Sequence, residues 1–91
     1  MATIKIPTPL RAYTDNQAKV EAPGGTVGEA LNSLVEQYPD LKPHLFKDDE
    51  LRNFVNVFLD DEDIRFLDGV ETSIEEDADL RIIPSIAGGS R

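Results

Sequence analysis

One segment of this 91-residue sequence repeats apolar side chains at helical spacing, and it constrains the fold more than any other feature. The residues that recur on one helix face are Val27, Ala30, Leu31, Leu34, Val35 and Tyr38. Thr26 and Glu29 have the spacing of a capping box at its start, and Pro39 ends it. We therefore predict one amphipathic helix over residues 27–38, with its apolar face packed across a sheet.

The segments on both sides of this helix have the residue patterns of β-strands. They alternate apolar and polar side chains or are rich in β-branched and aromatic ones, and they cover residues 3–7, 19–22, 54–59, 64–66 and 79–84. The first two flank a stretch with turn-forming residues, so we expect them to pair as a hairpin. Together these elements predict a two-layer α+β domain, in which a four- or five-stranded sheet packs on one main helix.

Two shorter patterns indicate local turns. Leu41, Leu45 and Phe46 could line a short helical turn after the main helix. Ser73 and Glu76 have the spacing of a capping box and could start a single helical turn before the last strand.

The side-chain chemistry of the chain excludes several kinds of site. There is no cysteine and one histidine, so thiolate metal sites, multi-histidine sites and a cysteine nucleophile are excluded. That histidine, His44, follows Pro43 in a predicted loop, and we interpret it as a surface residue. The run 60–63 is entirely acidic but lacks the ligand alternation and central glycine of a calcium loop. We therefore assign no catalytic residue and expect no metal and no cofactor.

The net charge and the hydropathy of the chain limit the classes of partner that it can bind. A net charge of −9 disfavours binding to nucleic acid and to anionic membranes, because both depend on basic side chains. No apolar run reaches the ~20 residues of a transmembrane helix. The first residues lack the basic and apolar regions of a signal peptide, so we expect a cytoplasmic protein.

The charge is unevenly placed along the chain. Residues 48–79 contain 13 acidic and two basic side chains, whereas the remainder contains five acidic and seven basic ones. This acidic segment could be a set of solvated loops. It could also be a surface that steers one basic partner toward the chain. Both interpretations stay open.

The C-terminal segment offers main-chain chemistry that the side chains do not. Gly88 and Gly89 have no Cβ, so the backbone there is thin and conformationally permissive. From Ile86 to Gly89 the chain can extend on the order of 10–14 Å, enough to thread into the active site of a partner. A frayed terminus is the simpler alternative.

Several segments resemble one known family. Residues 6–11, 54–59 and 61–66, together with the ending Arg-Ile-Ile-Pro-Ser-Ile-Ala-Gly-Gly at 81–89, resemble the MoaD/ThiS ubiquitin-like sulfur carriers, with the CysO-type branch most similar. The resemblance covers essentially the whole chain. It implies a β-grasp (ubiquitin-like) domain with a mixed sheet over residues 1–85 and a flexible tail with Gly-Gly over residues 86–91.

The resemblance also implies a function. In the family, an ATP-dependent adenylating enzyme of the MoeB/ThiF kind activates the terminal glycine, which then becomes a thiocarboxylate. That glycine falls on Gly89, and Ile86, Ala87 and Gly88 would thread into the partner's active site. A carrier of this kind is not an enzyme. It donates sulfur to a biosynthetic enzyme, either cysteine-synthase-like or molybdopterin-synthase-like.

The pathway and the final reaction remain open at this point. Cysteine biosynthesis is the expected pathway, with molybdopterin, thiamine and tRNA thiolation as alternatives. A protein modifier conjugated through Gly89 is the rival function on the same fold. The other rival is a binding or regulatory subunit that never uses its C-terminus.

Ser90 and Arg91 depart from the family pattern, which ends at Gly-Gly. A protease, with a metalloprotease as one possibility, removes them before activation in the first alternative. In the second, they are foreign to the natural chain. In the third, the chain is not activated at all. We predict that their removal exposes Gly89 and allows activation.

A partner surface follows from the strand alternation. If Val57 and Ile82 face the helix, then Phe58 and Ile83 face outward on the sheet. With Ile86 they would form an apolar patch near the base of the tail that is suited to a protein interface. The alternative is that loops cover them.

Overall fold

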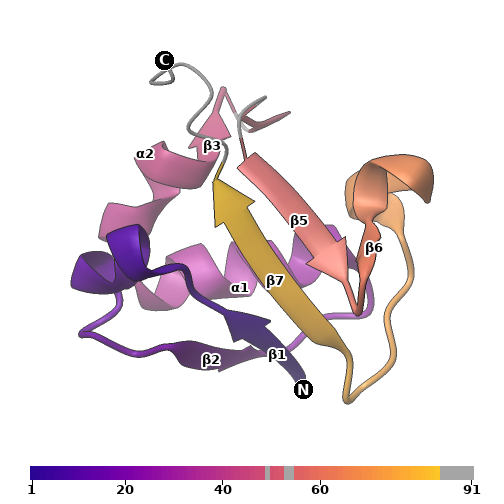
Figure 1. Cartoon of the computed structure of the whole chain (residues 1–91), viewed down its shortest axis with the longest axis horizontal. Coiled ribbons are helices and arrows are strands. Elements are labelled where there is room, and N and C mark those ends of the chain that lie inside the picture. The colour runs from indigo at the N-terminus through magenta and orange to yellow at the C-terminus, as the bar shows by residue number, and fades with distance from the viewer. Residues whose placement is uncertain (49, 53–54, 85–91) are drawn as a thin grey trace.

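A five-stranded mixed sheet and one long helix form the two layers of the fold (Figure 1). The computed structural model describes residues 1–48, 50–52 and 55–84. The elements of the two layers are β1 (Ala2–Lys5), β2 (Lys19–Ala22), α1 (Val27–Gln37), β5 (Val55–Leu59), β6 (Glu62–Asp63) and β7 (Asp79–Pro84). The strands lie in the order β2-β1-β7-β5-β6, with β1 and β7 parallel at the centre and the other pairs antiparallel. This topology is the predicted β-grasp arrangement.

The predicted N-terminal hairpin is confirmed. Strands β1 and β2 pair antiparallel, with Ile4 opposite Val20. The first strand lies at Ala2–Lys5 instead of residues 3–7, because Pro7 lacks an N–H for the ladder. The chain then forms a 3₁₀ helix, η1 (Thr8–Tyr13), and turns back through Asp15 and Asn16 at positive φ.

Helix α1 begins at the predicted cap. The Glu29 N–H donates to Thr26 Oγ1 at 3.2 Å, and Glu29 Oε1 accepts from the Gly25 N–H at 2.7 Å. The second bond of the capping box therefore reaches one residue beyond the cap. Gly24 lies so close that a Cβ there would be 2.6 Å from the Ala30 nitrogen. The helix ends at Gln37, one residue earlier than predicted.

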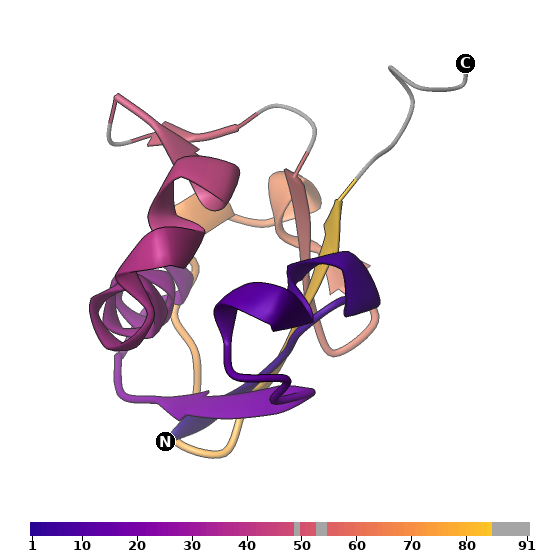
Figure 2. The ribbon, with the colours of Figure 1, turned by 90° about the vertical axis from the view of Figure 1, so that its left-hand side faces the viewer.

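The core lies between the helix and the inner face of the sheet. Figure 2 shows α1 on one side of this core and strands β5 and β7 on the other. The residues that share full burial across the two layers include Ile4, Val27, Leu31, Leu34, Val57, Leu80 and Ile82. The apolar stripe of α1 thus covers the inner face, as its periodicity predicts.

The connection from α1 to β5 contains a hairpin that the sequence analysis did not predict. A 3₁₀ turn η2 (Pro39–Leu41) and helix α2 (Lys42–Leu45) bury Leu41 and Leu45, which confirms the predicted helical turn for these two residues. The other predicted member, Phe46, instead starts strand β3 (Phe46–Lys47), which pairs with β4 (Glu50–Leu51).

Two predictions for the segment between β5 and β7 were wrong. Residues 64–66 form a 3₁₀ helix, η3 (Ile64–Phe66), because Asp63 Oδ1 accepts the Arg65 N–H at 2.9 Å and starts a turn. The short strand at this edge is β6. No helical turn begins at Ser73, which bridges Thr26 instead, while a further 3₁₀ helix, η4 (Gly69–Glu71), precedes it.

Candidate functional site

The outer face of the sheet carries the residues predicted to meet a partner. On β7, Leu80 and Ile82 are buried against the helix layer, whereas Ile83 is 37% exposed. On β5, Val57 is buried and Phe58 is half-buried on the opposite side. The predicted alternation is therefore confirmed for both strands.

Phe58 and Ile83 are diagonal neighbours on this face. In the antiparallel pairing of β5 and β7, Phe58 lies opposite Arg81, and Ile83 lies opposite Asn56. Diagonal side chains on adjacent strands are within reach of one another when one is aromatic. The two apolar residues are thus placed to form one patch, which we call the Phe58–Ile83 patch. Its role as an interface remains a prediction.

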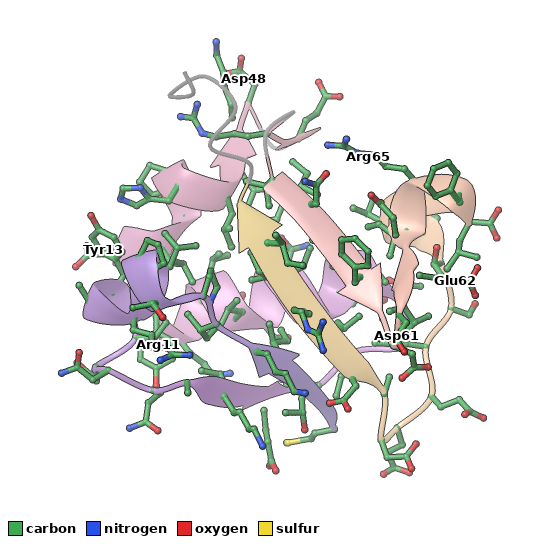
Figure 3. All side chains as sticks on the ribbon, viewed as in Figure 1. Arg11, Tyr13, Asp48, Asp61, Glu62 and Arg65 are labelled. Carbon is green, nitrogen blue, oxygen red and sulfur yellow. The ribbon has the colours of Figure 1, made fainter. Side chains whose placement is uncertain are left out.

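Basic side chains surround this patch on the side of β1. Lys5 lies opposite Arg81 in the parallel pairing of β1 and β7. Arg11 projects from η1 (Figure 3), and its Nε–H donates at 3.0 Å to the carbonyl of Ile6, the residue that follows β1. The three basic residues line one hollow of about 310 Å³ together with Ile83. No sequence pattern indicated this grouping, because Lys5 and Arg81 become neighbours only through the parallel pairing of β1 and β7.

Acidic side chains lie around the turn between β5 and β6. Asp61 and Glu62 lie at this turn (Figure 3), and a second hollow of about 150 Å³ is lined there by Asp60, Asp61 and Asp79 beside Lys5 and Arg81. In the described part of 48–79, every acidic residue except the half-buried Asp63 is exposed. These described carboxylates are thus solvated, and the role of the acidic segment in steering a partner remains a prediction.

The described residues show neither a metal cluster nor a membrane-spanning helix. They contain no group of three or more histidine or carboxylate residues placed to hold a metal ion. None of the helices in the described ranges is long and apolar enough to cross a membrane. His44 is half-buried and stacks on Tyr13, with 4.2 Å between ring centroids, so it joins α2 to η1 as a packing residue.

The C-terminal segment, for which the sequence predicts the chemistry, follows β7 in the chain. Strand β7 ends at Pro84, opposite Val55 at the start of β5. The predicted tail residues lie outside the described residues, and they are Ile86, Ala87, Gly88, Gly89, Ser90 and Arg91. Ile83, one residue before Pro84, therefore places one side of the Phe58–Ile83 patch at the end of β7, while Phe58 lies opposite Arg81 in the middle of that strand.

A comparison with models of protein families shows the family to which this chain belongs. The model of the ThiS family matches residues 4–89, which is nearly the full length. The chain belongs to the ThiS family. The match ends on Gly89 and leaves Ser90 and Arg91 outside it.

Individual relatives of this ThiS-family chain agree with that result. The sulfur carrier protein CysO of Mycobacterium tuberculosis is 37% identical over 90 residues, which cover 96% of this chain and 97% of CysO. A chain in the crystal structure of the BexX/CysO complex of Amycolatopsis orientalis is 38% identical with a TM-score of 0.89, covering 98% of this chain and all of that one. Small archaeal modifier protein 3 of Haloferax volcanii is 34% identical over 64 residues, 70% of each chain. The resemblance to CysO-type carriers and the β-grasp fold are confirmed.

Proposed function

We propose that this ThiS-family chain is a sulfur carrier that bears a thiocarboxylate on Gly89. The observation that carries the proposal is the family match, which runs through the β-grasp domain and ends on this glycine. Similarity to CysO along nearly the full length supports the same function. The absence of cysteine is compatible with it, because the sulfur would be held by the main chain.

The proposed chemistry takes place at the C-terminal carboxyl group. A protease first hydrolyses the Gly89–Ser90 peptide bond and releases Ser90 and Arg91. The Gly89 carboxylate then attacks the α-phosphorus of ATP, which gives an acyl-adenylate and releases pyrophosphate. Sulfide then attacks the carbonyl carbon, the bond to the AMP phosphate oxygen breaks, and AMP leaves, so that the thiocarboxylate forms without any change of oxidation state. The chain supplies a substrate, and its partner supplies the catalysis.

The partner for the first step is an adenylating enzyme of the MoeB/ThiF kind. The Phe58–Ile83 patch supports docking at the base of the tail, because Ile83 is exposed beside the half-buried Phe58, and apolar side chains clustered on one face are typical of protein interfaces. Ile86, Ala87 and Gly88 would then enter the enzyme's active site with Gly89 at the end. The exposed acidic segment 48–79 would steer a basic region of a partner.

Cysteine biosynthesis is the pathway that we propose for the sulfur. The similarity to CysO supports it, and the acceptor would be a cysteine-synthase-like enzyme that uses an activated serine derivative. A product attached to Gly89 could then be released by a metalloprotease. The alternative pathways are molybdopterin synthesis with a molybdopterin-synthase-like acceptor, thiamine synthesis and tRNA thiolation. Sulfur transfer to any of these acceptors would replace cysteine biosynthesis as the assigned pathway.

A protein-modifier function is the second candidate. The similarity to small archaeal modifier protein 3 favours it, because the chemistry differs only in the final acceptor. In this case the activated Gly89 carbonyl would form an isopeptide bond with a lysine amine of a target protein.

One experiment separates these functions. The form that ends at Gly89 is incubated with the adenylating enzyme, ATP and sulfide, and its intact mass is measured. A gain of one sulfur-for-oxygen difference supports the carrier, and conjugates in cell extracts without that gain support the modifier. If neither product forms, the result supports a binding or regulatory subunit that is not activated at its C-terminus. A form that ends at Gly88 is the matched control, because it lacks only the last glycine and should not be activated.

A further inference from the structure

One hollow on the outer face concentrates positive charge on an otherwise acidic chain. Its lining contains three basic residues, Lys5, Arg11 and Arg81, and no acidic one. The whole chain has a net charge of −9, with nine basic residues in total. A third of them therefore gather at one site beside the strand that leads to the tail.

In the described part of the chain these cations make no salt bridge, and the nearest carboxylates, those of Asp60, Asp61 and Asp79, lie outside this hollow in the adjoining one beside Lys5 and Arg81. Over the described ranges, the side chains of Lys5 and Arg81 make no ion pair or hydrogen bond, and Arg11 bonds only the Ile6 carbonyl. Lys5 and Arg81 also lie directly opposite one another on adjacent strands, where like charges destabilise the sheet. A carboxylate that entered the hollow would relieve this repulsion.

The hollow is also partly organised before any partner binds. The bond from Arg11 Nε to the Ile6 carbonyl fixes the base of the guanidinium and leaves its terminal nitrogens without a described partner. Guanidinium groups bind carboxylates through two parallel hydrogen bonds, which adds direction to the charge attraction. Preorganised donors reduce the entropy that a partner must lose on binding.

Ile83 joins this hollow to the Phe58–Ile83 patch. It lines the hollow and is 37% exposed, two residues after Arg81 on β7. We propose that an acidic segment of the adenylating enzyme docks here, with one or more Asp or Glu side chains in the hollow and an apolar residue against Ile83. The inference rests on the proposed function and names the chemistry of the partner surface.

Long polyanions fit the same surface less well. RNA carries many phosphates, and the acidic residues Asp60, Asp61 and Asp79 lie beside Lys5 and Arg81 in the adjoining hollow. Those carboxylates would repel any anion that extends beyond the cationic site. A short acidic segment of a folded partner avoids that repulsion.

The test compares charge variants in binding to the adenylating enzyme. Arg81→Glu and Lys5→Glu should each raise the Kd for the adenylating enzyme by about tenfold. Isothermal titration calorimetry measures this Kd. Arg81→Gln should weaken it less, because it removes a charge without adding one. Lys47→Glu is the matched control, since Lys47 is exposed on β3 and does not line the hollow, and it should bind as the wild type does. Unchanged melting temperatures would confirm that the variants fold.

Salt and turnover separate this inference from the proposed function. Wild-type binding should weaken as NaCl rises, and the Arg81→Glu variant should show a smaller salt dependence. If the wild type forms the thiocarboxylate and the Arg81 and Lys5 variants bind as tightly as Lys47→Glu, the cationic docking site is wrong and the carrier function stands. If the wild type forms no thiocarboxylate, the carrier function fails and this inference with it. Tighter binding of the wild type to RNA than to the enzyme would also overturn it.

Discussion

The two faces of the sheet come from the same strands but differ in what covers them. On β7, the inner residues Leu80 and Ile82 are fully buried under α1, while Ile83 on the outer face is more than a third exposed. The outer face also holds the basic side chains of Lys5 and Arg81, whereas the buried residues of the inner face are apolar. A single strand therefore contributes both to the core and to the proposed docking surface. Substitutions on the two faces should separate stability from partner binding.

The largest expected effect is on the inner face. Replacing the fully buried Leu34 with alanine leaves a cavity between α1 and the sheet, and should lower the free energy of unfolding by about 2–5 kcal/mol. Urea denaturation measures this loss. Ile83→Ala is the matched control and should cost less, about 1 kcal/mol, because that side chain is 37% exposed and leaves no closed cavity. Equal losses at both positions would contradict the difference between the faces.

On the outer face, the expected loss is in binding. Ile83→Asp puts a charge into the apolar patch and should weaken binding to the adenylating enzyme by about 100-fold, within the range of interface hot spots. Phe58→Ala should have a smaller effect in the same direction, because Phe58 is half-buried. Calorimetric titration and thermal melting together report binding and folding.

An exposed aromatic residue outside the proposed docking surface controls for non-specific hydrophobic binding. Phe66 in η3 is 85% exposed and is not on β5 or β7, so Phe66→Asp should leave binding unchanged. If Phe66→Asp weakens binding as much as Ile83→Asp, the docking surface extends well beyond the sheet.

A glycine at the start of α1 tests how closely the helix layer is held. Gly24→Ala should lower the free energy of unfolding by about 2 kcal/mol, because its Cβ would meet backbone atoms of Ala30 and Glu29 and cannot move away easily. The neighbouring Gly25→Ala is the control, since its Cβ would meet only Glu29 Oε1 at 3.4 Å. Equal stabilities of the two variants in denaturant would show that the loop relaxes.

The smallest expected effect is at the helix cap. Thr26→Ala removes the acceptor for the Glu29 N–H and should cost about 1 kcal/mol of stability. Binding to the adenylating enzyme should be unchanged, because the cap belongs to the helix layer. A measured change in binding with unchanged stability would contradict the separation of the two faces.

Long periodic segments of the sequence predicted the fold well. The stripe on α1 and the alternation on β5 and β7 each repeat often enough to identify a buried face, and so Phe58 and Ile83 could be assigned to the outer face. Short elements could not be predicted in this way. Strands β3 and β4 have two residues each, and one side-chain hydrogen bond from Asp63 was enough to turn 64–66 into a 3₁₀ helix.

The cationic hollow shows a second limit of sequence patterns. Lys5 and Arg81 are far apart in the chain and meet only because β1 and β7 pair in parallel. Arg11 joins them through η1, a 3₁₀ helix that no periodicity indicated. Charge placement in three dimensions therefore had to come from the structure, whereas the Gly-Gly ending could be read from the sequence.

The most direct test of the carrier function is the intact mass of the protein purified from its native cells. The account predicts a species that ends at Gly89, with one oxygen replaced by sulfur in part of the population. The adenylating enzyme's absence should remove the sulfur-containing species and leave the form with an ordinary carboxylate. Detection of only the chain that still carries Ser90 and Arg91 would contradict the account.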